Sequence, residues 1–327
     1  MRLPLAAVAA LALLACGAAF TEARADARGD AVRAFEQRQD RAALEQFEAL
    51  AKAAPDDAEL QNYLGRARLR AGQVNEGVAA LERAVKLAPD NSTYHLNLSG
   101  GLGQQVELVG VFKKMGIAGR VKDHIERAVA LAPDSVRARE ALMQFYAQAP
   151  GIAGGSMDKA REQVAHVMRS NTSVGLRMQA SLARIEKKPD AEITAAWEQA
   201  VAADDAEGTA RFAYATYLTS RERWDEAFVQ LDALAKLRPG APAVKYQLGR
   251  AAALSGQRLA EGEAALKSYL ETGPQAEGDL GRDAAHWRLG MVLEKAGRRD
   301  EARAQYQASL KENPAFKQAR EALDKLD

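Results

Sequence analysis

The chain has few of the residues that carry most protein chemistry. Among its 327 residues are one cysteine and four histidines, and only 6% are aromatic. A single cysteine excludes a disulfide framework and a cysteine-rich zinc site. Lys+Arg 45 against Asp+Glu 44 give a formal net charge of +1, which excludes the strong basic field typical of nucleic-acid binding. With 47% hydrophobic residues, the chain can still bury a large core.

Long apolar runs are also missing, except at the start. Met1-Arg2 provides a short positive segment, and the stretch from Leu3 to Phe20 is apolar. This order is typical of an export signal. Ala23-Arg24-Ala25 matches the A-x-A pattern of a cleavage site, which predicts a signal peptide over residues 1–25 and a mature chain that starts at Asp26.

A second cleavage site competes with the first. Leu13-Leu14-Ala15-Cys16 resembles the lipobox of bacterial lipoproteins, which would end the signal at Ala15 and place a lipid on Cys16. Either site predicts a neutral mature protein that is exported to the periplasm, soluble or lipid-anchored. Contact with the membrane is expected only through a lipid on Cys16.

The rest of the chain repeats. Pro55 and Pro89 lie 34 residues apart in matching contexts, and similar phrases end at Pro133, Pro239 and Pro314. A Leu-Gly pair recurs at Leu64-Gly65, Leu248-Gly249 and Leu289-Gly290, and a small residue opens the second half of each unit, at Ala43, Gly77, Ala160, Ala227 and Ala302.

These anchors resemble the tetratricopeptide repeat (TPR), a helix-turn-helix unit of 34 residues. The resemblance covers nearly all of residues 26–327 and implies an all-α, right-handed α-solenoid of about eight units over residues 26–316, followed by a capping helix over 317–327. Residues 101–160 resemble a group of exported bacterial TPR proteins with no defined biochemical function.

Three places interrupt the period. Pro89 and Pro133 are 44 residues apart, and the extra residues lie near 104–119. This insert is apolar, so we expect lengthened helices or a hairpin packed on the solenoid, with a partner-contact surface as the alternative. The second interruption is a loop near 149–156, where Gly154-Gly155 predicts a turn and Ser156 a helix cap. The third runs from Gln275 to Arg282.

Catalytic and metal-binding patterns are absent. The four histidines show no i+3 or i+4 pairing, no H-E-x-x-H or G-x-S-x-G motif occurs, and Gly151 to Lys159 does not match a phosphate-binding loop. We therefore expect no enzyme activity, no catalytic residue, no cofactor and no metal site.

The TPR resemblance implies a concave groove lined by the first helix of each unit. The carboxylate clamp of chaperone-binding members is not matched, because Leu96 and Gly100 follow Asn62 and Arg66 at the corresponding positions. Large and polar side chains at the groove positions are the candidate contacts: Asn62, Arg66, Phe212, Tyr246, Arg250, Trp287 and Met291.

The expected function is a non-enzymatic protein–protein interaction scaffold of the bacterial cell envelope that binds a peptide or protein in this groove. The alternative is an accessory binding component of a solute transport or secretion system. An accessory subunit of an enzyme, without chemistry of its own, also stays open. No nucleic-acid partner is expected, and the sequence does not identify the protein partner.

Overall fold

The computed structural model describes residues 26–203, 208–276 and 278–326. The described chain forms eight helical hairpins, and we call the two helices of each hairpin the A helix and the B helix. The first A helix covers residues 26–36. The other A helices are α3 (Ala58–Arg70), α5 (Ser92–Glu107), α7 (Val136–Gln148), α9 (Thr172–Ile185), α11 (Thr209–Ser220), α13 (Pro242–Ser255) and α15 (Arg282–Lys295).

The B helices follow their partners directly. They are α2 (Asp40–Ala53), α4 (Val74–Leu87), α6 (Val111–Leu131), α8 (Met157–Ser170), α10 (Asp190–Ala202), α12 (Trp224–Leu237), α14 (Leu259–Thr272) and α16 (Arg299–Glu312). A last helix, α17 (Lys317–Leu326), packs Leu323 and the buried Leu326 on the final hairpin. The predicted all-α solenoid of about eight units with a terminal cap is confirmed.

Glycines set the close approach of A and B helices. A methyl group at Gly249 would lie 2.2 Å from Leu266 Cγ, and one at Gly290 would lie 2.4 Å from Tyr306 Cε1. A side chain at these positions would collide with the facing helix, which accounts for the glycine of the recurring Leu-Gly pair. Each recurrent proline stands two residues after a B helix, as Pro89 does after α4, because proline cannot continue a helix.

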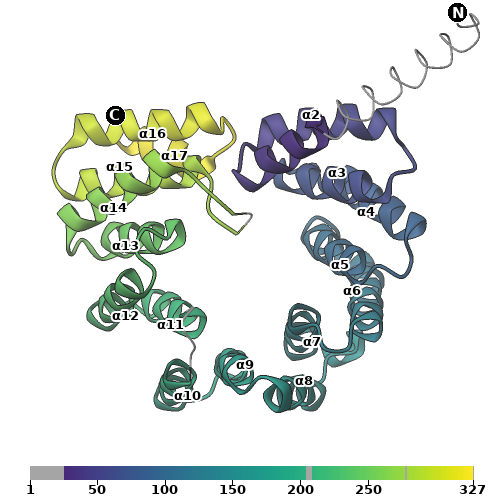
Figure 1. Cartoon of the computed structure of the whole chain (residues 1–327). Coiled ribbons are helices and arrows are strands. Elements are labelled where there is room, and N and C mark those ends of the chain that lie inside the picture. Colours follow the sequence, from purple (N-terminus) through teal and green to yellow (C-terminus); the bar gives the residue numbers. More distant parts are fainter. Residues whose placement is uncertain (1–25, 204–207, 277, 327) are drawn as a thin grey trace, which may run out of the picture.

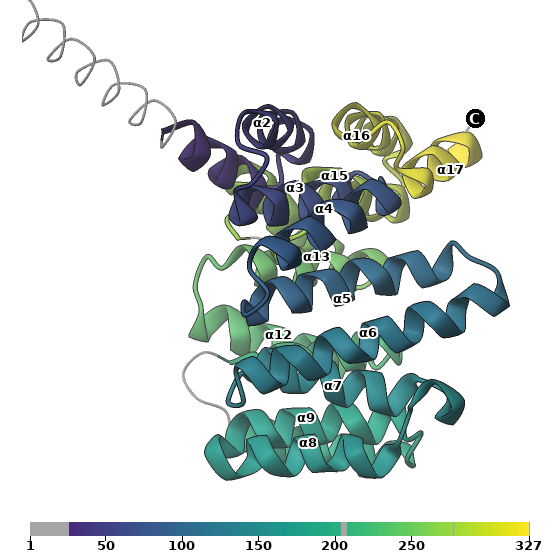
Figure 2. The same cartoon turned by 90° about the vertical axis from the view of Figure 1, so that its right-hand side faces the viewer.

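The insert forms longer helices rather than a loop. α5 has 16 residues and α6 has 21, against 13 to 14 in most other units. Their shared end projects beyond the neighbouring hairpins (Figure 2). Ile117 and Val121 pack on the core around Leu81 and Leu98, whereas Leu108 is 64% exposed. Part of the extra length thus packs on the core of the solenoid, and part projects beyond it.

The loop near 149–156 lies against this insert. It contains the short 3-10 helix η1 (Gly151–Ala153), and a Cβ at Gly154 would meet Lys122 of α6 at 3.0 Å. Gly154 adopts a left-handed conformation with φ +91°, and Ser156 Oγ accepts the N–H of Lys159 at 3.3 Å. The predicted turn and the predicted helix cap are both confirmed.

Arginines at the turns link successive hairpins on their B-helix side. Arg223, Arg258 and Arg298 each stand directly before a B helix. Arg258 Nη1 donates to Asp232 Oδ2 of the preceding B helix at 3.0 Å, and Arg298 Nη1 to Glu263 Oε2 at 2.6 Å. Each arginine also pairs with a glutamate three residues on: Glu226, Glu261 and Glu301. We call these three residues the outer arginines.

The solenoid curls into a ring. Figure 1 shows A helices on the inner side, B helices on the outer side, and the first and last units next to one another. The repeat period alone does not predict this closure. It results from the small rotation that each unit adds to the one before it.

Candidate functional site

On the inner wall of the ring, the charged side chains of the helices α9, α11 and α13 are all positive. The A helices α9, α11 and α13 contain no acidic residue, and each contains at least one arginine. The B helices α10, α12 and α14 on the outside contain three acidic residues each. Charge is thus separated between the two walls of a chain that is almost neutral overall.

The early A helices are joined by polar side chains. Asn97 Nδ2 donates to Asn62 Oδ1 at 2.8 Å, and Arg137 Nη2 donates to Asn97 Oδ1 at 3.2 Å. These contacts join α3, α5 and α7. Asn62 is only 3% exposed, so this candidate contact serves packing between units and offers a partner little surface.

Arg66, the second early candidate, lies over aromatic rings. Its guanidinium carbon is 4.7 Å from the centre of the Phe35 ring and 5.0 Å from that of Tyr63. Both rings belong to the first two hairpins. Arg66 thus lies beside the core cluster formed by Phe35 and its neighbours, and its side chain is half-buried.

The later candidates gather on α11, α13 and α15. Phe212 is half-buried against the core around Phe228 and Leu231. Tyr246 is 5% exposed and meets Tyr269 edge to face, with ring centroids 5.7 Å apart. Tyr246 is thus mainly a core residue, and a partner would reach little of it.

Arg250, Trp287 and Met291 keep part of their surface exposed. Arg250 Nη1 donates to the neutral Gln247 Oε1 at 3.2 Å. Trp287 packs against Phe316, which precedes α17, with ring centroids 5.6 Å apart. These three side chains are the predicted contacts that the structure leaves most available near one another.

Arg288 was not predicted and lies between them. Its Nη1 contacts Met291 Sδ at 3.3 Å, and its guanidinium carbon lies 3.9 Å from the centre of the Trp287 ring. Its Nε is buried without a hydrogen-bond partner among the described residues. Burial lowers the pKa of Arg288, the phenol of Tyr246 raises it, and the charge of Arg250 lowers it further. The lack of acidic residues on α11 and α13 was the sequence signal for this group.

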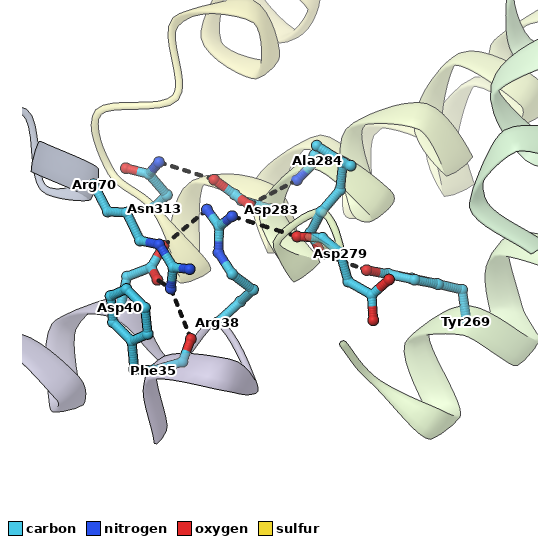
Figure 3. Close-up of polar contacts among 10 residues, drawn as sticks. Phe35, Arg38, Asp40, Arg70, Tyr269, Asp279, Asp283, Ala284 and Asn313 are labelled. Carbon is cyan, nitrogen blue, oxygen red and sulfur yellow. Dashed lines mark hydrogen bonds and ion pairs between the residues drawn. The ribbon is translucent and has the colours of Figure 1, made fainter. Parts of the chain in front are cut away.

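A second candidate region is the place where the ring closes. Arg38, in the turn before α2, donates from Nη1 to the main-chain oxygen of Asp279 at 3.3 Å and from Nη2 to Asp40 Oδ2 at 3.1 Å (Figure 3). Arg70 Nη1 donates to the Phe35 main-chain oxygen at 2.7 Å. The residues that meet here are 241 positions apart in the sequence.

The loop before α15 is held by its own contacts at this closure. Asp279 accepts the N–H groups of Gln275 and Ala276 at 2.8 and 3.0 Å, and the Tyr269 hydroxyl donates to the Leu280 main-chain oxygen. A cleft of about 780 Å³ lies between this loop and the first hairpin. Its lining mixes cations and anions: Arg38, Arg41, Arg70 and Arg282 with Asp40, Glu45, Asp283 and Glu312.

Two histidines that are far apart in sequence also come together. His95 Nδ1 and His124 Nδ1 are 2.9 Å apart, and His95 Nε2 is 2.9 Å from the Pro89 main-chain oxygen. Where His95 donates from Nε2 to the Pro89 oxygen, its Nδ1 is the acceptor of a hydrogen bond from the Nδ1–H of His124. Burial and the neighbouring His95 lower the pKa of His124. Two nitrogens make a hydrogen-bonded pair, and across residues 26–203, 208–276 and 278–326 no group of three or more His, Cys, Asp or Glu side chains is placed to hold a metal ion.

The predicted signal peptide and Cys16 lie outside the described residues, so the cleavage site and the lipid remain predictions. In the described part of the chain, every helix falls short of the length or hydropathy needed to cross a bilayer.

Comparison with known proteins identifies repeats at both ends of the array. Tetratricopeptide repeat models match residues 30–92 and residues 283–316. No curated protein matches the sequence.

The solved structures that match this chain share little sequence with it. A tetratricopeptide repeat protein from Parabacteroides merdae ATCC 43184 is 12% identical, with a TM-score of 0.45, over 93% of this chain and 99% of that one. YrrB, described as a TPR protein with an unusual peptide-binding site, is 15% identical over 76% of this chain and 99% of its own, with a TM-score of 0.35. PilW, a type IV pilus biogenesis factor, is 13% identical over 81% of this chain and 98% of its own, with a TM-score of 0.38.

Family models match the first two hairpins and the last one, and the hairpins between them repeat the same A-helix and B-helix packing. The chain therefore carries tetratricopeptide repeats at residues 30–92 and 283–316, joined by hairpins of the same build.

Proposed function

We propose that this protein is a non-enzymatic scaffold of the bacterial cell envelope that binds a peptide or protein partner along its inner A helices. TPR proteins in general are interaction scaffolds, and their curved arrays present extended binding surfaces. The observation that carries the proposal here is the separation of charge: the inner helices α9, α11 and α13 have no acidic residue, and Arg250 and Arg288 have no carboxylate partner among the described residues.

The location in the envelope rests on the sequence of residues 1–25. An export signal is the only long apolar segment in the sequence, and both cleavage patterns lead out of the cytoplasm. Cell fractionation and mass spectrometry of the mature N-terminus test this. A chain that begins at Asp26 or at a lipid-modified Cys16 supports export, with Cys16→Ala as the control for lipid. A chain that keeps Met1 and stays in the cytoplasm would refute it.

Site-specific photo-crosslinking tests the binding surface. A photoreactive residue at Thr216 of α11 or Met291 of α15 samples the inner wall, and one at Val229 of α12 samples the outer wall, where Val229 is 62% exposed. We expect both inner positions to crosslink the same partner in intact cells and the outer position to give none of it. Equal capture from all three positions would contradict the inner wall as the binding surface.

The alternative role, an accessory binding component of a solute transport or secretion system, calls for a pocket suited to a small molecule. The cleft at the ring closure is lined by charged side chains, some of which pair with one another, as Arg70 does with Asp40. This lining favours the scaffold. Crosslinking exclusively to subunits of one transporter would favour the alternative.

A further inference from the structure

Arg288 is a partly buried cation that has no carboxylate partner among the described residues. Its neighbours are the Trp287 ring, the Met291 sulfur and the Tyr246 side chain, none of which carries negative charge at neutral pH. The Nε is buried and has no hydrogen-bond partner in the described chain. Burying a charge is costly unless an opposite charge compensates it, so this arrangement is unfavourable as it stands.

Arg250 increases that cost. It lies on the adjacent helix α13, and its charge lowers the pKa of the Arg288 guanidinium. Its own hydrogen bond goes to Gln247, a neutral acceptor. Two guanidinium groups therefore repel one another on helices α13 and α15, where α13 supplies no acidic residue to separate them.

The same protein pairs other arginines efficiently. Arg258, eight residues after Arg250, binds carboxylates from Asp232 and Glu261. Carboxylates are abundant on α12 and α14, yet none within the described ranges reaches Arg250 or Arg288. Arg250 and Arg288 thus differ from the outer arginines in having no carboxylate partner among the described residues.

We propose that Arg250 and Arg288 together bind a carboxylate of an extended partner segment that lies across α13 and α15 inside the ring. The inference rests on the proposed scaffold function and adds the chemistry of the ligand. Arginine forks match the geometry of a carboxylate, and the Trp287 ring and Met291 offer an apolar surface for the residue beside it. A nucleic acid would need many more cations along its backbone than a chain of net charge +1 provides on this wall.

The test is selection of a random 12-residue peptide library on the full chain. We expect peptides enriched on the wild-type protein to share an Asp or Glu, or a free C-terminal carboxylate. The double variant Arg250→Gln, Arg288→Gln should lose them. Arg258→Gln, which removes an outer arginine, is the matched control and should keep them. Circular dichroism confirms that each variant is folded.

The enriched peptide is then synthesised in three forms. The first keeps its Asp or Glu, the second has Asn or Gln in place of that residue, and the third has an amidated C-terminus. Each arginine substitution should weaken binding of the acidic form about tenfold or more, the size expected for a charged hydrogen bond. The amide and the amidated form show which carboxylate is bound.

Two groups of outcomes overturn the proposal differently. Enriched peptides without an acidic group, or binding that survives the double substitution, would refute the carboxylate site and leave the scaffold function standing. No enrichment at all would refute both. Single-stranded RNA that binds and is lost on the same double substitution would assign the site to phosphate instead.

Discussion

The inner and outer arginines of the later repeats lie a few residues apart in sequence but differ in every contact. Arg223, Arg258 and Arg298 each bind a carboxylate of the preceding unit and one of their own. Hydrogen bonds to glutamate raise their pKa values and lower those of Glu226, Glu261 and Glu301. Arg250 and Arg288 donate to an amide and a thioether. The outer arginines thus link successive units, and the proposal that Arg250 and Arg288 bind a ligand rests on this difference.

Arg250 keeps its place on the inner wall only while α13 packs closely against α14. Gly249→Ala disturbs that packing, and of the substitutions considered it should change the stability most. The added methyl would lie 2.2 Å from Leu266 Cγ, inside a buried interface. We expect the free energy of unfolding to fall by about 2 kcal/mol, measured by urea denaturation.

Gly100→Ala is the control for that substitution. Gly100 also lies within an A helix, α5, but a Cβ there meets no atom within 4 Å. Alanine is the better helix former, so this variant should be about 0.5–1 kcal/mol more stable. Equal losses for both variants would show that close packing is not what the repeated glycine provides.

Arg258→Met sharpens the outer side of the comparison. The change removes the ion pairs with Asp232 and Glu261 and the stacking of the guanidinium on Phe228, 4.6 Å from the ring centre. Since partly exposed ion pairs contribute little each, we expect a loss of about 1 kcal/mol that shrinks in high salt. A loss unaffected by salt would mean that packing alone accounts for this residue.

The His95–His124 pair gives the smallest expected effect and shows what a buried base does when it can lose its proton. The lowered pKa of His124 means that the unfolded chain binds more protons below its ordinary value of 6.5. Stability should therefore be full above about pH 6.5 and fall as the pH drops toward the folded pKa. Arg288, in contrast, cannot lose its charge by giving up a proton near neutral pH.

His124→Gln keeps a hydrogen-bond donor for His95 and removes the titration. We expect a flatter dependence of the unfolding free energy on pH between 7 and 5, while Arg120, Asp123 and Glu82 around the site stay as they are. An unchanged slope would assign the acid sensitivity to other groups.

The hairpins could be predicted from the sequence because each depends on residues that are local to it. Gly290 must face Tyr306, Pro314 must follow α16, and Gly297, with φ +79°, must turn the chain between α15 and α16. The residues in each of these contacts lie within about one repeat of each other, so the 34-residue spacing is enough to predict the contacts.

Contacts between distant units could not be predicted in this way. Arg38 reaches Asp279 only because small rotations accumulate over the whole array, and the period carries no measure of that rotation. His95 and His124 meet across an insert that breaks the repeat. Arg288 was missed because its position within the repeat is not one that the family uses for its groove.

The most direct test of an inner wall built for a ligand is the unfolding free energy of Arg288→Met beside Arg258→Met. Methionine keeps much of the length of the arginine side chain and removes a partly buried charge that has no carboxylate partner among the described residues. We therefore predict that Arg288→Met leaves the stability unchanged or raises it by up to about 1 kcal/mol, whereas Arg258→Met lowers it. If Arg288→Met destabilises the protein as much as Arg258→Met, the inner arginine is a structural residue and the ligand-based account of this wall is wrong.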